Sequence, residues 1–300
     1  MKPGISNSAE SQKGVGLAMT AIIHLIRLRK AAPTSGNSRA AFTLTELCVV
    51  IACVGVLALL VLPALAAGKV QSASAGCLYN LRHLMIGWEM YRTEYNDYLM
   101  PNAPLGSYIA GWISPQGVEN WANAPANTNR VYYTNSSALM WPYVNNNLSV
   151  YRCPGDVVPS ANGMRIRSYS MNSAMIGGLQ GNIAPLLGYN PGWRVYFKGS
   201  DIVRPTPANA FVFADESPDS INDGYLQTGL NSPVFPDVPA CYLEGGCGFS
   251  FADGHGEIHR WQTSVLLIPV RQGVTEINVS PSDSARNVDW LWFRQHASSR

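Results

Sequence analysis

An uninterrupted apolar segment is the feature that most limits how this chain of 300 residues can fold. The segment from Leu47 to Gly68 reads LCVVIACVGVLALLVLPALAAG and contains no charged side chain. Its 22 residues exceed the ~20 that a helix needs to cross the hydrocarbon core of a bilayer. A secretory signal peptide is the alternative, but its apolar region is shorter, about 7–15 residues. The segment therefore predicts a single membrane-spanning helix.

Charge is distributed unevenly about this segment. Residues 1–41 hold six basic side chains and one acid, a net +5, whereas the remainder holds 15 basic and 18 acidic residues, a net −3. Because basic residues favour the cytoplasmic side, this bias predicts a cytoplasmic amino terminus and an extracytoplasmic domain. A basic excess confined to one end predicts no nucleic-acid partner. Both Met1 and Met19 are compatible with the start of the chain.

A short motif, RAAFTLTEL at residues 39–47, precedes the apolar segment. It resembles the prepilin cleavage and methylation site of type IV pilins and type II secretion pseudopilins. The resemblance implies that a prepilin peptidase cuts between Ala41 and Phe42 and that the new amino group of Phe42 is methylated. Ala41 stands where the family usually has glycine. Pro63 stands where such pilins often carry a proline, and it predicts a kink in the helix.

Glu46 is a lone carboxylate at the edge of the apolar segment. At the centre of a bilayer such a charge costs about 2.5–3.5 kcal/mol, so it needs a partner or a shallow position. After cleavage the nearest cation is the amino group of Phe42, on the same or a neighbouring subunit. The alternative is that Glu46 caps the helix together with Thr43 or Thr45.

Apolar residues continue past the segment mostly at steps of three and four, which is typical of one face of an amphipathic helix. They are Val70, Ala73, Cys77, Leu78, Leu81, Leu84, Met85, Trp88, Tyr91 and Tyr95. The pattern predicts one helix from about Thr43 to Asn96. Its first half is apolar all round, and its second half offers one face for a globular domain to cover.

The fold class that follows is α+β. A long N-terminal helix, transmembrane in its first half and amphipathic in its second, packs on a mainly antiparallel β-sheet domain with long loops. The clearest strand candidates are residues 211–213 and 249–251. The predicted organisation is a prepilin leader, a transmembrane half-helix, an amphipathic half-helix and a globular pseudopilin-like domain, at residues 1–41, 42–68, 69–98 and 99–300.

The outer part of the chain carries a second resemblance. Residues 151–156, 215–224 and 251–255 read YRCPGD, DESPDSINDG and FADGH. They resemble the prepilin-like group with a C-terminal H-X9-DG signature. Asp253, Gly254 and His255 are present, but Leu243 stands where the signature has its histidine. No role of that histidine is therefore carried over to this chain.

Two groups of side chains are candidates for metal binding. Closely spaced oxygen donors followed by a turn glycine suit Ca²⁺, and these are Asp215, Glu216, Asp219, Asn222 and Asp223. The alternative is an ordinary turn, because the same residue types bond their own backbone. Asp253, His255 and His259 are compatible with a transition metal. Here the alternative is a hairpin turn at Asp253-Gly254.

Four cysteines lie in the polar part of the chain: Cys77, Cys153, Cys241 and Cys247. An even number in an exported domain permits two disulfides with three connectivities. A Cys77–Cys153 bond would hold the long helix to the domain, and a Cys241–Cys247 bond would close a small loop.

The function expected from the sequence is structural. The chain is expected to be a non-enzymatic pilin-like or pseudopilin subunit of the bacterial inner membrane, with the peptidase, membrane lipid and other subunits as partners. No cofactor is required, although Ca²⁺ is compatible. One alternative is a membrane-anchored surface- or carbohydrate-binding module that uses aromatic rings near residues 108–143. A second is a metal-dependent enzyme that uses the region from Asp253 to His259.

Overall fold

The structure is a computed structural model. It describes residues 43–104, 110–114, 124–178, 190–227, 229–271 and 287–300, without the side chains of residues 60–67 and 70. The chain divides into two compact units, Met1–Leu59 and Leu60–Arg300.

Helix α2, Leu44–Glu94, begins at a capping box. The backbone N–H and the hydroxyl of Thr43 donate to Glu46 Oε2 at 2.9 and 2.6 Å, and the Glu46 N–H donates to Thr43 Oγ1 at 3.3 Å. This reciprocal pairing binds N–H groups that a helix start otherwise leaves without partners. The helix ends where Asn96 and Asp97 adopt positive φ angles of 53° and 70°.

Within the second unit, α2 buries one face. Its buried residues recur at steps of three and four and are Cys77, Leu81, Leu84, Met85, Trp88 and Tyr91. Ile86 and Met90 lie on other sides of the helix and are 49% and 46% exposed. The buried face forms one hydrophobic core with Tyr169, Met171, Phe213 and neighbouring residues.

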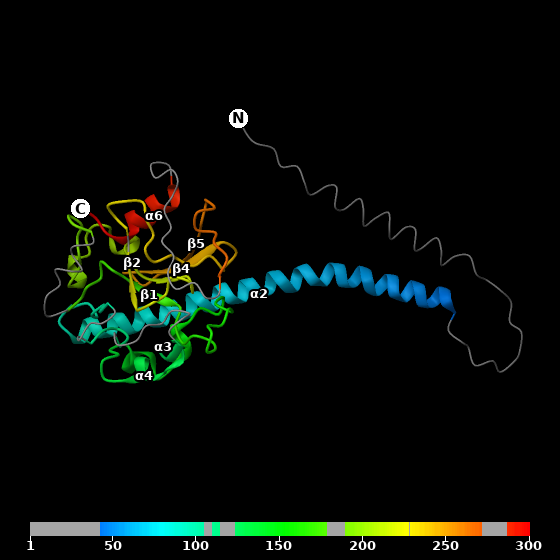
Figure 1. Cartoon of the computed structure of the whole chain (residues 1–300), viewed down its shortest axis with the longest axis horizontal. Helices are drawn as coiled ribbons and strands as arrows, with labels where there is room; N and C mark the ends of the chain where they lie inside the picture. The colour runs from blue at the N-terminus through cyan, green and yellow to red at the C-terminus, as the bar shows by residue number, and fades with distance from the viewer. Residues whose placement is uncertain (1–42, 105–109, 115–123, 179–189, 228, 272–286) are drawn as a thin grey trace, which may run out of the picture. The chain divides into compact units, whose positions relative to one another are not determined.

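The sheet has five strands in the order β3-β1-β2-β4-β5. Figure 1 labels β1, β2, β4 and β5. In chain order these are β1 Tyr169–Asn172, β2 Phe211–Asp215, β3 Tyr225–Leu226, β4 Gly246–Phe251 and β5 Gly256–Arg260. The β1–β2, β2–β4 and β4–β5 pairs are antiparallel, whereas β1 and β3 are parallel. The remaining helices are α3 Ala124–Thr128, α4 Val131–Thr134 and α6 Val288–Ala297, with short 3-10 helices η1 Trp141–Val144, η2 Leu148–Tyr151, η3 Gly199–Asp201 and η4 Pro207–Asn209.

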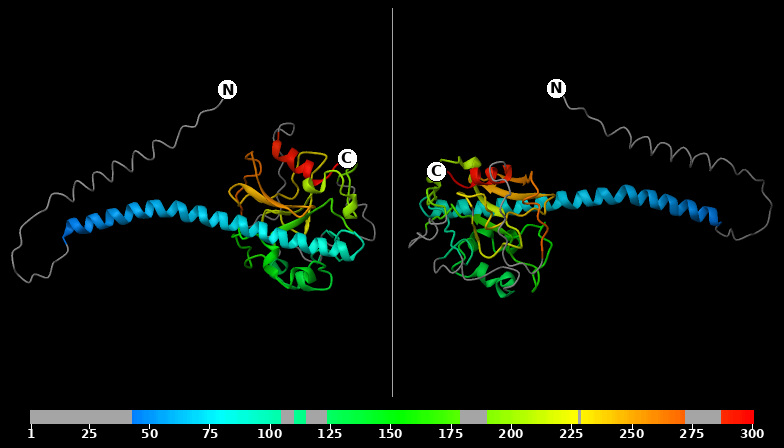
Figure 2. Two further views of the ribbon diagram at one scale, coloured as in Figure 1. Left: turned by 180° about the vertical axis from the view of Figure 1, so that it is seen from behind. Right: turned by 45° about the horizontal axis from the view of Figure 1, so that its top comes forward.

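The two faces of the sheet bury different helices. One face packs on α2, and the other carries a second core in which Phe211 and Phe249 contact Phe293 of α6. Figure 2 shows α6 on the side of the sheet away from α2. A bulge in β2 lets this strand contribute side chains to both cores. Phe211 pairs with Phe251 and Phe213 pairs with Ser250, so Val212 is an extra residue on β2. As a result Phe211 and Phe213 lie in different cores.

Two buried arginines hold the loops around β1. Arg165 Nη2 lies 2.5 Å from Asp156 Oδ1, and both side chains are almost completely buried. Arg167 donates to the Tyr169 and Asp223 carbonyls and, at 2.6 Å, to Ser170 Oγ. Because unpaired charges are costly inside a protein, these contacts fix the paths of the loops.

The fold class predicted from the sequence is wrong in two respects. Among the described residues, no helix is both long and apolar enough to cross a bilayer, so a transmembrane first half of the helix is not supported. The sheet is also mixed, because β3 pairs parallel to β1. The backbone of α2 is helical at Pro63, but the Pro63 side chain lies outside the described part.

The buried face of α2 gives a test of this packing. Leu81→Ala should lower the free energy of unfolding by about 2–5 kcal/mol, because it leaves a cavity in a closely packed core. Ile86→Ala, on an exposed side of the same helix, should change it by less than about 1 kcal/mol. Urea unfolding followed by tryptophan fluorescence measures both. Equal effects of the two variants would contradict the assignment of the buried face.

Candidate functional site

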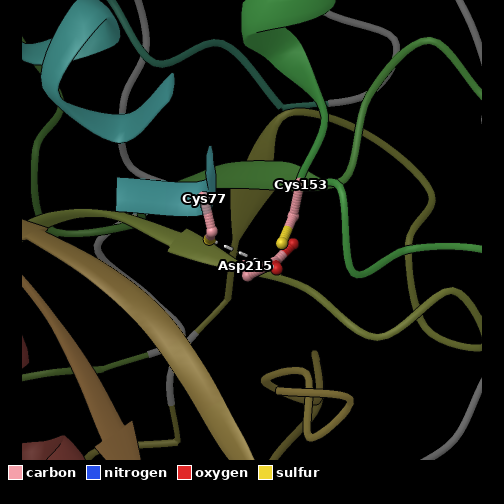
Figure 3. A group of neighbouring side chains, drawn as sticks. All are labelled: Cys77, Cys153 and Asp215. Carbon is pink, nitrogen blue, oxygen red and sulfur yellow. Dashed lines mark hydrogen bonds between the residues drawn. The ribbon is translucent and has the colours of Figure 1, made fainter. Parts of the chain in front are cut away.

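Three side chains distant in sequence meet beneath α2 (Figure 3). They are Cys77 on α2, Cys153 in the turn after η2, and Asp215, the last residue of β2. One donor atom of each lies within 4.8 Å of the other two, and all three residues are buried. The Cys77 thiol donates to Asp215 Oδ2 over 4.0 Å. Among the described residues, this is the one group of three or more such side chains close enough to hold a metal ion.

Each of these side chains also accepts a hydrogen bond from outside the group. The Tyr169 hydroxyl donates to Cys77 Sγ at 3.3 Å, and the Gly155 N–H donates to Cys153 Sγ at 3.4 Å. The Tyr242 hydroxyl donates to Asp215 Oδ1 at 2.6 Å. These partners orient the sulfur and carboxylate atoms.

The sheet makes room for the group. A Cβ atom on Gly248 of β4 would lie 2.5 Å from Cys77 Sγ, so a side chain at this position would displace the cysteine. After the bulge, successive side chains of β2 alternate between the two faces of the sheet, so Asp215 lies on the same face as Phe213, toward α2. Cys153 is held by its N–H, which donates to Ser168 Oγ at 2.9 Å. The helix, the turn and the strand therefore each position one of the three side chains.

Burial controls the ionisation of this group. It raises the pKa of Asp215 to about 7, although hydrogen bonds from Tyr242 and Ser168 act in the opposite direction. Burial also raises the pKa of the Cys153 thiol. With no ion bound, the Cys153 thiol is therefore favoured in its protonated form at neutral pH.

The structure brings together one of the two predicted cysteine pairs. Cys77 and Cys153 are neighbours, but all six cysteines are free thiols, so neither predicted disulfide is formed. Cys241 donates to the Ile268 carbonyl at 3.2 Å, and Cys247 to the Asp215 carbonyl at 3.1 Å. The thiols of Cys241 and Cys247 thus donate to two different backbone carbonyls.

The acidic stretch from Asp215 to Asp223 does not converge on one point in the described structure. Glu216 accepts from the Ser170 and Ser220 hydroxyls, and burial raises its pKa to about 8. Asp219 accepts from the Arg271 N–H at 2.7 Å. Asp223 accepts from the Tyr225 N–H at 2.8 Å, two residues further along the chain, as an aspartate in a turn does. The half-buried Asn222 lies in the same loop. The structure thus matches the turn alternative and not the predicted Ca²⁺ ligand set.

Asp253 and Gly254 form the turn between β4 and β5. Asp253 Oδ1 accepts from the His255 N–H at 3.1 Å and lies 2.6 Å from His255 Nδ1. Gly254 has a φ of +92°, which favours glycine. His259 lies apart from this pair and stacks on Trp292 at 3.6 Å between ring centroids. The three residues therefore form a hairpin turn and an aromatic contact, and not a shared ligand set.

The Asp253-Gly254 turn and α2 together line an open groove of about 560 Å³. The other lining residues come from one side of the helix: Arg82, Met85, Ile86, Glu89, Met90, Thr93 and Glu94. Leu243, at the position of the signature histidine, is buried in the core next to α2 and does not line this groove. Position 243 has a packing role in this chain.

The predicted cleavage site, Ala41 and Phe42, lies outside the described residues. Glu46 is described, and its carboxylate bonds Thr43 as the helix-capping alternative predicted. Of the described rings near residues 108–143, Trp112 and Tyr133 are buried, whereas Tyr132, Trp141 and Tyr143 are half-buried. Tyr108 and Trp121 lie outside the described residues.

Sequence reasoning missed Tyr169, Tyr242 and Arg167. Tyr169 and Tyr242 contact Cys77 and Asp215 from parts of the chain with no recognisable motif. Arg167 is a buried cation in a stretch that reads as a polar loop. No spacing in the sequence indicates these contacts, because each depends on tertiary packing.

Comparison with known protein families, curated proteins and solved structures finds no match for this chain.

The half-buried His259 predicts acid sensitivity. Burial lowers its pKa to about 4 from 6.5, and the nearby His296 acts in the same direction, although Asp289 opposes them. The folded state therefore binds fewer protons than the unfolded state between these values. The contribution of His259 to the free energy of unfolding should be fully present above pH 6.5 and should be lost as the pH drops toward 4. The loss should be on the order of 1–2 kcal/mol after allowance for partial exposure.

His259→Phe retains an aromatic ring against Trp292 and removes the titrating group. Denaturant unfolding at pH 7.5 and 4.5 should show a smaller loss of stability at low pH for this variant than for the parent. Identical losses would show that His259 does not contribute to acid sensitivity.

Proposed function

We propose that this protein is a pilin-like or pseudopilin-like structural subunit, and that the start of α2 packs against neighbouring subunits. The observation that carries the proposal is the exposed apolar surface of the helix in the Met1–Leu59 unit. Its large apolar side chains are between 46% and 78% exposed: Leu44, Leu47, Val49, Val50, Ile51, Val54, Val56, Leu57 and Leu59. Because exposed apolar area costs about 25 cal/mol per Å², a continuous surface of this kind favours association.

The motif before the helix supports the same role. The string at residues 39–47 resembles a prepilin site, and proposed cleavage before Phe42 would put a new amino group one residue ahead of the capping box. The capping box keeps the Glu46 carboxylate in the first turn of the helix. We propose that this carboxylate neutralises the amino terminus of a neighbouring subunit and sets the register between the two helices.

The prepilin-like motif supports a prepilin peptidase as the processing partner. The proposed contact is between helices of neighbouring subunits and needs no membrane-spanning helix. The role requires no catalytic residue and no cofactor.

Processing can be measured on the full chain. Co-expression with a prepilin peptidase should remove residues 1–41, and intact mass spectrometry should show a mature chain that begins at Phe42. Ala41→Gly should be processed at least as completely, because glycine restores the residue usual at this site in prepilins. An unchanged mass with and without the peptidase, for both the parent and Ala41→Gly, would count against the pilin pathway.

Assembly can be measured by chemical cross-linking of the processed protein. Leu57→Lys should reduce cross-linked oligomers strongly, because it places a charge in the proposed helix contact. Val157→Lys is the control, because Val157 is 65% exposed in the other unit and is not part of the proposed contact. Equal cross-linking of the two variants would contradict the contact, and recovery with lipid vesicles as a monomer would favour a lipid surface instead.

A further inference from the structure

We infer that Cys77, Cys153 and Asp215 form a buried structural site for a thiophilic divalent cation of the Zn²⁺ class. Two cysteine sulfurs and one carboxylate oxygen are donors that zinc accepts, and structural zinc sites take all four of their ligands from the protein. This inference is independent of the proposed subunit role.

The separations suit such an ion after a small contraction. Zn–S bonds of about 2.3 Å and Zn–O bonds of about 2.0–2.2 Å at tetrahedral angles place sulfur and oxygen donors roughly 3.5 Å apart. Cys77 Sγ and Asp215 Oδ2 are 4.0 Å apart, and all three donor atoms lie within 4.8 Å of one another.

Tyr169 offers a fourth donor, its hydroxyl oxygen. Its hydroxyl is fully buried and lies 3.3 Å from Cys77 Sγ, about the spacing of two ligands on one tetrahedral ion. The Gly155 N–H to Cys153 and the Tyr242 hydroxyl to Asp215 would remain as the hydrogen bonds that orient the ligands. The site thus has four donors and outer partners for two of them.

Charge also favours a cation here. Within the described part of the chain, no lysine, arginine or histidine forms a recorded ion pair with Asp215, although its side chain is completely buried. A bound divalent cation would offset two of the three negative charges of the carboxylate and the two thiolates. Binding would release the thiol protons to solvent. Because all three residues are buried, the ion would enter during folding or through local opening.

A Cys77–Cys153 disulfide is the competing use of the same sulfurs. A disulfide carries no charge, so it would leave the Asp215 carboxylate buried beside an apolar bond. The metal site gives all three side chains a role and explains why the carboxylate lies beside the two sulfurs.

The site would join parts of the chain that are far apart in sequence. Cys77 and Asp215 are separated by 138 positions, and Cys153 adds the turn after η2. Because a cross-link that closes a long loop removes much conformational freedom from the unfolded chain, the ion would stabilise the attachment of α2 to the sheet.

The test uses the full chain purified without chelator and supplied with Zn²⁺ or Co²⁺. Elemental analysis should find stoichiometric zinc, and Co²⁺ should give the visible bands of a tetrahedral site with thiolate charge transfer. Cys153→Ser and Asp215→Asn should lose most of the bound metal. Cys241→Ser is the matched control, because Cys241 is half-buried and bonds the Ile268 carbonyl. It should bind metal as the parent does.

Two results would overturn the inference: a Cys77–Cys153 disulfide in non-reducing peptide mass spectrometry without bound metal, or free thiols that take up neither ion. The Co²⁺ spectrum of the parent protein keeps the test valid if a variant fails to fold. Processing and cross-linking are separate measurements, so a failed metal test would leave the proposed subunit role standing.

Discussion

The packing of one face of α2 against the sheet is the constraint on which the globular unit depends. Leu81, Leu84 and Trp88 are almost completely buried and share a core with residues of β1 and β2. Without the helix that face of the sheet would expose aromatic side chains, and without the sheet the helix would expose a hydrophobic stripe. The two are stable only together, because each covers apolar area that the other would leave in water.

Polar contacts then determine how the loops fit around this core. Arg165 and Arg167 are buried cations whose partners are Asp156, backbone carbonyls and Ser170. A buried charge is costly unless it is paired, so these contacts favour one arrangement of the surrounding loops over others. The tyrosines that contact Cys77 and Asp215 act similarly at the edge of the same core.

Local patterns in the sequence were enough for some features and not for others. The three-four spacing predicted the buried face of α2 from Cys77 to Tyr91, although Tyr95, at the end of the same pattern, lies beyond the helix and is 48% exposed. The Asp253-Gly254 pair indicated a hairpin. The hydropathy of residues 47–68 predicted a membrane span that the described helices do not support. The meeting of Cys153 with Asp215 and the parallel β1–β3 pair depend on chain paths between distant segments, which no local periodicity encodes.

The bulge in β2 has a consequence for how this sequence can vary. Because Val212 is an extra residue, its removal would shift Phe211 relative to Phe213 and direct one of them to the wrong side of the sheet. Loops at the surface tolerate changes of length far better than such a strand does. A related protein with the same two-sided packing should therefore align with residues 211–215 without a gap, even where its connecting loops differ greatly in length.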